Sequence, residues 1–121
     1  MDAFILSSRL SKSLEHDVIV MLCNFPPKSA ETAAKALIEE QLAACVNLLS
    51  PVTSVYCWEG EICVEQEVPL LIKAPRRLAE RLQARIHELH PYDVPEVIAL
   101  PVDESASSPA YLAWVRALGS T

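Results

Sequence analysis

The residues of this chain best suited to chemistry are its cysteines and histidines. The chain has four cysteines and three histidines. No two cysteines have the C-x-x-C spacing of a structural zinc site, and their irregular spacing does not suggest a disulfide framework. The chain also has no glycine-rich phosphate loop, no G-x-S-x-G motif and no H-E-x-x-H motif. These observations predict a reduced protein that is not an enzyme.

Two of the cysteines, Cys57 and Cys63, flank a predicted turn at Glu59-Gly60. A three-residue turn would place them opposite each other across a hairpin, close enough to form a disulfide or to share a soft metal ion. A two-residue turn would shift the register and separate them. We expect two free thiols, because cytosolic proteins are kept reduced.

The composition excludes several classes of partner. Ten Lys and Arg against sixteen Asp and Glu give a net charge of −6, whereas a nucleic-acid-binding protein needs a basic surface. No apolar run approaches the roughly eighteen residues of a membrane-spanning helix. The start of the chain, Met1-Asp2, lacks the positive charge of a signal peptide. We therefore expect a cytoplasmic protein that binds neither nucleic acid nor membrane.

The hydrophobic periodicity predicts a single domain over residues 17–119. Residues 1–16 are predicted to be a leader that forms a disordered tail or a short frayed helix. The predicted elements, in chain order, are a strand at 18–23, a helix at 30–43 capped by Ser29, hairpin arms at 45–58 and 61–73, a helix between Pro75 and Pro91, a strand at 94–102, and a helix starting after Ser108 that buries Tyr111, Trp114, Val115 and Leu118. This β-α-β-β-α-β-α order predicts an α+β, ferredoxin-like fold with its helices on one face of an antiparallel sheet.

The predicted hairpin is long for so small a domain. Each arm would extend roughly 40 Å at ~3.3 Å per residue, against a radius of gyration of only ~13 Å for a domain of this size. We expect Pro51 and Pro69 to mark a bulge or bend, because proline cannot donate to the ladder. A projecting two-stranded ribbon is only marginally stable by itself. The hairpin therefore predicts burial against another copy of the chain.

Three segments together resemble the CutA-type divalent-cation tolerance proteins. They are Leu42-Ala43-Ala44-Cys45-Val46-Asn47, Ser54-Val55-Tyr56-Cys57-Trp58-Glu59-Gly60 and His90-Pro91-Tyr92-Asp93-Val94-Pro95-Glu96, with Lys73 and the closing Tyr111-Leu112-Ala113-Trp114 in addition. The resemblance runs in order from about Val18 to Leu118. It implies a cytoplasmic homotrimer that is built by the long hairpins, is shaped like the PII signalling proteins, and is linked to tolerance of copper and other divalent ions.

The same resemblance implies a metal site at Cys23 and His90, since matching positions in the family are associated with copper ligation. Thiolate and imidazole both suit copper, and soft sulfur favours Cu(I). The family pattern can carry a second histidine before His90, but this chain has Leu89 there. The alternatives are that Cys23 is a small buried apolar residue and that His90 complements the end of its helix.

A second predicted site lies in a cleft between subunits. It comprises Tyr56, Trp58, Glu67, Lys73 and Tyr92. Residues 54, 56 and 58 share one face of their arm, and a Glu with a Lys and aromatic walls can bind a small polar ligand or an ion. The alternative is that these residues are contacts of the trimer, because aromatic residues are common in interface cores.

Two functional hypotheses follow. The first is a trimeric, non-enzymatic protein of metal-ion homeostasis that binds copper or another divalent cation and needs no organic cofactor. The second is a PII-like sensor, in which a small effector occupies the cleft and an unidentified partner protein responds to it.

Overall fold

The computed structural model describes residues 17–119, so the predicted leader at 1–16 lies outside the described residues. The elements are β1 (Val18–Phe25), α2 (Pro27–Glu39), β2 (Cys45–Leu48), β3 (Val52–Trp58), β4 (Glu61–Pro75), a 3-10 turn (Arg76–Leu78), α3 (Ala79–Leu89), β5 (Val97–Pro101), a second 3-10 turn (Glu104–Ala106) and α4 (Pro109–Arg116). The strands form one antiparallel sheet in the order β2-β4-β1-β5, and β3 pairs with the outer half of β4.

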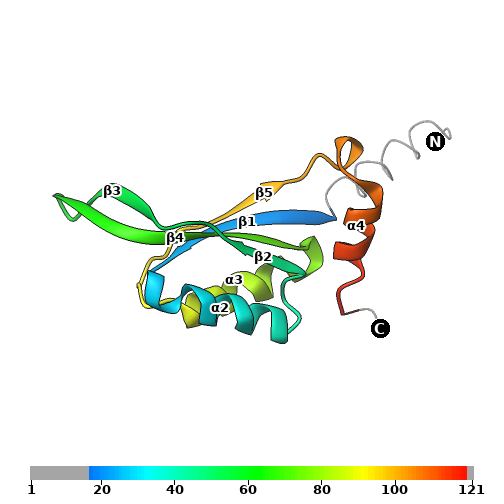
Figure 1. The fold of residues 1–121 in the computed structure, drawn as a ribbon, viewed down its shortest axis with the longest axis horizontal. Coiled ribbons are helices and arrows are strands. Elements are labelled where there is room, and N and C mark those ends of the chain that lie inside the picture. Colours follow the sequence, from blue (N-terminus) through cyan, green and yellow to red (C-terminus); the bar gives the residue numbers. More distant parts are fainter. Residues whose placement is uncertain (1–16, 120–121) are drawn as a thin grey trace, which may run out of the picture.

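This topology confirms the predicted ferredoxin-like fold. Figure 1 shows α2 and α3 together under one face of the sheet, α4 at one end, and the β3–β4 hairpin projecting from the other end. The opposite face of the sheet carries no helix along most of its length. In the described part of the chain, no helix has the length and apolar character needed to cross a membrane.

The core lies between the sheet and the two helices. Alternate β1 side chains, from Ile19 to Phe25, are buried against residues of β4 such as Leu70 and Ile72. The buried face of α2 is mostly alanine, with Leu37 as its largest buried side chain, so the helix approaches the sheet closely. Burial of each large aliphatic side chain contributes about 1.5–3 kcal/mol, and this makes the core the main source of stability.

The predicted helix at 30–43 is shifted toward the N-terminus. It begins at Pro27, because proline is tolerated at the first helical position, and the carbonyl of Pro26 accepts the backbone N–H groups of Ser29 and Ala30. Ser29 is therefore inside the helix rather than at its cap. The helix ends before Gln41, whose φ of 56° is left-handed.

The hairpin projects as predicted, although its first arm is not continuous. Residues 49–51 separate β2 from β3, and Pro51 lies in this break, whereas β4 continues through Pro69 for 15 residues. The turn has two residues, Glu59 with φ 50° and Gly60 with φ 82°. Positive φ at both positions matches the twist of a tight hairpin and favours Gly.

The stripe predicted for the last helix is partly wrong. Ser108 caps α4 as expected, and its Oγ accepts the N–H of Tyr111 at 3.3 Å. The helix buries Leu112 and Val115 against Val18, while the side chains of Tyr111 and Trp114 are 42% and 56% exposed. Arg116 holds the helix in this rotation by pairing with the buried side chain of Glu104. Glu104 in turn accepts a hydrogen bond from the backbone N–H of Val18.

Candidate ligand-binding cleft

The register of the hairpin decides which side chains share a face of the ribbon. Trp58 lies opposite Glu61, Tyr56 opposite Cys63, and Ser54 opposite Glu65. Because side chains alternate along a strand, these residues share one face. Cys57 lies opposite Ile62, so the two-residue turn places Cys57 and Cys63 on opposite faces. Both thiols are free.

The aromatic face of the ribbon forms a cleft with the segment that follows α3. The cleft has a volume of about 410 Å³, which is within the usual range for small-ligand sites. Its lining residues are Asn24, Ser54, Val55, Tyr56, Trp58, Glu67, Tyr92, Val94 and Glu96. A second hollow of about 330 Å³ continues it past Tyr56 and Tyr92 toward Glu65 and Asp93. Four of the five residues predicted for the inter-subunit cleft therefore line one hollow.

The phenol groups of Tyr56 and Tyr92 are tied to one carboxylate. The Tyr92 hydroxyl donates a hydrogen bond to Glu65 Oε2 at 3.0 Å. The pKa of Tyr56 and that of Tyr92 are both raised to about 12. The main cause is desolvation, and the second is hydrogen bonding to Glu65. Both phenols are therefore protonated near neutral pH and offer polar edges together with apolar rings.

Glu67 is the most buried polar side chain of the cleft, at 8% exposure. It lies on β4 opposite Val52. Its charge contributes to the raised pKa values of Cys23 and Tyr92, which places those groups within its electrostatic reach. Among residues 17–119, no side chain forms a hydrogen bond or ion pair with the Glu67 carboxylate within the usual distance limits.

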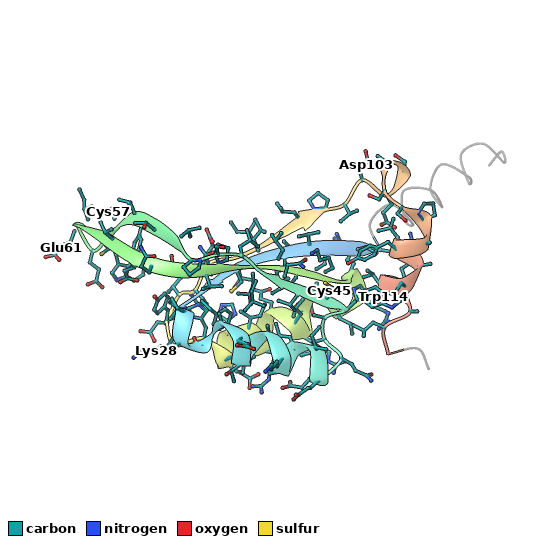
Figure 2. All side chains as sticks on the ribbon, viewed as in Figure 1. Lys28, Cys45, Cys57, Glu61, Asp103 and Trp114 are labelled. Carbon is teal, nitrogen blue, oxygen red and sulfur yellow. The ribbon has the colours of Figure 1, made fainter. Side chains whose placement is uncertain are left out.

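Lys73, the fifth residue predicted for the cleft, lines neither hollow. It lies opposite Cys45 in the β2–β4 ladder, and its ammonium group donates to Asn47 Oδ1. The Cys45 thiol is close to Tyr111 and contributes to the raised pKa of that phenol, after burial. Lys73 therefore belongs to a separate polar group near α4, and Figure 2 shows Cys45 far from the hairpin tip that carries Cys57 and Glu61.

Cys23 and His90 meet at the carbonyl oxygen of Asn24. His90 Nε2 lies 2.6 Å from this oxygen, and Cys23 Sγ lies 3.9 Å from it. Because a carbonyl only accepts, Nε2 carries the proton, and Nδ1 accepts the backbone N–H of Tyr92 at 3.1 Å. His90 also stacks against Phe25 and Tyr92, with ring centroids 4.4 Å and 4.7 Å apart. Both ring nitrogens are thus engaged, and His90 holds Asn24 and Tyr92 at the edge of the cleft.

These contacts do not fit a metal bound by Cys23 and His90 in this conformation. Burial, followed by the charges of Glu96 and Glu67, raises the pKa of the Cys23 thiol to about 12, so the metal-free protein holds a protonated thiol whose proton a metal ion would have to displace. The described residues contain no group of three or more His, Cys, Asp or Glu side chains placed to hold a metal ion.

The sequence analysis missed several residues that complete the cleft. Asn24 is at the end of β1, and its Nδ2 donates to Glu96 Oε2 at 2.8 Å. Glu65 could have been inferred from Glu67, because residues two apart on a strand share a face. Asn24 and Glu96 had no such signal, since their meeting depends on the pairing of β1 with β5.

The described chain thus combines a ferredoxin-like sheet, a projecting hairpin and a cleft of ligand size at the hairpin's base. The chain belongs to the CutA1 divalent ion tolerance protein family, whose model matches residues 19–118.

Individual relatives agree with this assignment. A divalent-cation tolerance protein CutA from Thermus thermophilus is 46% identical over 80% of this chain and 93% of its own length. A Protein CutA from Mus musculus is 46% identical over 74% of this chain, which corresponds to 49% of the mouse protein. Among solved structures, a PII-like protein CutA from a Nostoc species, in apo form, superposes with a TM-score of 0.77 at 46% identity, covering 80% of this chain and 92% of that one.

Proposed function

We propose that this protein is a homotrimeric, PII-like binding protein of divalent-cation tolerance, which responds to a small effector bound in the cleft at the base of its hairpin. The observation that carries the proposal is the cleft itself, a hollow of about 410 Å³ walled by aromatic rings and carboxylates. Aromatic and acidic linings of this size suit the binding of a small ligand, so the proposed activity is binding. An unidentified partner protein would respond to the occupied state.

The trimer is proposed from the opposite face of the ribbon. Val55, Ile62 and Val64 lie there, and they are 66%, 79% and 64% exposed. Ile98 and Leu100, on the sheet face without helices, are 46% and 41% exposed, and strand alternation places them on the other side of the sheet from this ribbon patch. Exposed apolar side chains gathered on one face of the ribbon mark an interaction site, and a neighbouring copy that covered the ribbon would place the cleft beside the seam between subunits.

Effector binding is tested by a thermal-shift screen. A ligand that binds only the folded protein raises its melting temperature. The screen should include divalent cations, small organic cations, nucleotides and small acids, and each active compound should be repeated on Trp58→Ala, which removes one wall of the cleft. A compound that stabilises the parent protein but not the variant supports the proposal. If no compound shifts the parent protein, the binding function fails.

Copper at Cys23 and His90 is the second candidate function, favoured by the proximity of both side chains to the Asn24 carbonyl. Coordination would require loss of the Cys23 proton and of one His90 hydrogen bond. Titration of the purified protein with Cu(I) should therefore be compared with titrations of Cys23→Ser and His90→Ala. Equal affinity in all three proteins would exclude these residues as ligands.

We also propose a cytoplasmic location, which is supported by the four free cysteines. A relative from Arabidopsis thaliana is named as chloroplastic, so the location should be measured directly by fractionation or by imaging of a tagged chain.

A further inference from the structure

The buried carboxylate of Glu67 lacks a counter-ion in the isolated subunit. Its side chain is 8% exposed and lines the cleft, and the described residues supply no hydrogen-bond or ion-pair partner to it. The carboxylate is not sealed off, because Arg116 Nε is the one fully buried unpaired side-chain N or O atom of the described residues; the small part of the Glu67 side chain that stays accessible can be reached by a ligand. The space beside Glu67 is the cleft, so its missing partner would come from that side.

The surroundings of Glu67 favour a positive charge. Glu65 lines one of the two hollows and Glu96 the other, and Tyr56, Trp58 and Tyr92 line both. Aromatic faces attract cations electrostatically, most strongly when the cation is partly desolvated. No Lys or Arg lines either hollow, so the described chain offers no competing cation there.

The donor set fits an organic cation better than a metal ion. The described residues present no group of three ligand side chains in metal-binding positions, and aromatic walls displace the waters that a divalent ion would retain. An alkylammonium ion instead needs one carboxylate and apolar walls, and quaternary ammonium ions are recognised by aromatic cages.

We propose that the cleft binds a small organic cation of the alkylammonium class, with Glu67 as its counter-ion and the rings of Trp58, Tyr56 and Tyr92 as its walls. This inference rests on the proposed binding function, because it specifies the chemical class of the effector.

A cationic side chain from a neighbouring subunit is the competing explanation, and the stability of Glu67→Gln separates the two. The substitution keeps the shape and removes the charge. If Glu67 is unpaired in the ligand-free assembly, the variant should melt about 2–5 °C higher, because a largely desolvated carboxylate without a counter-ion is replaced by a neutral amide. A lower melting temperature with a parallel loss of trimer would show that the neighbour supplies the cation and would overturn the proposal.

Binding is measured through the fluorescence of Trp58. The chain has two tryptophans, and Trp114→Phe at the exposed α4 surface leaves Trp58 as the only reporter. The probes are choline and its neutral isostere 3,3-dimethyl-1-butanol, which differ in charge but hardly in shape. Both are titrated into the reporter protein, into its Glu67→Gln variant, and into a Glu61→Gln control that removes an exposed carboxylate of the same strand.

The expected result is saturable binding of choline, weakened about tenfold or more by Glu67→Gln and unchanged by Glu61→Gln, with little binding of the neutral isostere. Equal affinity for the two probes, or equal affinity of the Glu67→Gln and parent proteins, would refute the assignment of an organic cation. Binding of neutral or anionic compounds alone in the effector screen would refute this assignment and leave the proposed function standing. Failure of all compounds in that screen would remove both.

Discussion

The apolar face of the hairpin is the surface whose alteration should most directly change the assembly. Ile62 and Val64 are 79% and 64% exposed, and they lie on the ribbon face opposite Tyr56. Replacing both by lysine should leave the subunit folded, because neither side chain contributes to its core. The same change should dissociate the proposed trimer.

The size of the effect follows from the exposed fractions. Full burial of an Ile or Val side chain contributes about 1.5–3 kcal/mol, and these two retain about two thirds to four fifths of that area for contact with a neighbour. Their loss should therefore cost about 2–4 kcal/mol per subunit, which weakens association roughly 30- to 700-fold. Desolvation of the new ammonium groups adds to the loss.

The assay is light scattering coupled to size exclusion over a dilution series. The parent protein should remain near three times 13.3 kDa, and the Ile62→Lys, Val64→Lys variant should shift toward one subunit as it is diluted. Glu61→Lys, which changes charge on the other ribbon face, is the control. A variant that remains trimeric at every concentration, or a parent protein that is monomeric, would refute the argument for a trimer.

Three further predictions concern stability. Burial raises the pKa of the Cys23 thiol from 9.0 to about 12, so this thiol ionises at lower pH in the unfolded chain than in the folded one. The free energy of unfolding should therefore fall by about 1.4 kcal/mol per pH unit between these two values. Thermal melts across the alkaline range should show this contribution in the parent protein and not in Cys23→Ala. Ser108→Ala should cost about 1 kcal/mol in urea denaturation because it removes a helix cap, whereas Ser29→Ala, inside α2, should cost much less, and equal losses would contradict the cap assignment. Gly60→Ala should cost about 1–2 kcal/mol of folding stability, because Gly60 has φ 82°, where an alanine is strained, and an added Cβ would have no atom within 4 Å to pack against. Gly60→Asn should recover much of this loss. An alanine variant as stable as the parent protein would argue against the two-residue turn.

The fold was largely predictable because its signals are local. The continuous apolar run at the start of the domain, the Glu59-Gly60 turn and the prolines identified the strands, the hairpin and the helix boundaries. The start of α2 was predicted too late because Ser29 suits an N-cap, whereas the carbonyl of Pro26 accepts the first helical N–H groups.

The cleft was only partly predictable because it depends on contacts between distant elements. Alternation along one arm grouped Tyr56 with Trp58, but no periodicity indicates that Asn24 meets Glu96 across the β1–β5 pairing. Lys73 was grouped with these residues by resemblance, yet the register of β2 with β4 places it beside Cys45. The rotation of α4 likewise depends on Arg116 and Glu104, which are distant from the apolar pattern used to predict its buried face.

The continuity of β4 has a mechanical consequence. Its 15 residues pass without a break from the hairpin tip to the end of the core sheet, whereas the opposite arm is interrupted at residues 49–51 (Figure 1). A force that bends the ribbon must therefore flex a single polypeptide segment whose inner half includes the fully buried Leu70 and Ile72. Displacement of the hairpin tip is thus transmitted to the centre of the subunit through the continuous backbone of β4. When β4 bends, the irregular residues 49–51 of the other arm can absorb the resulting difference in length between the two arms.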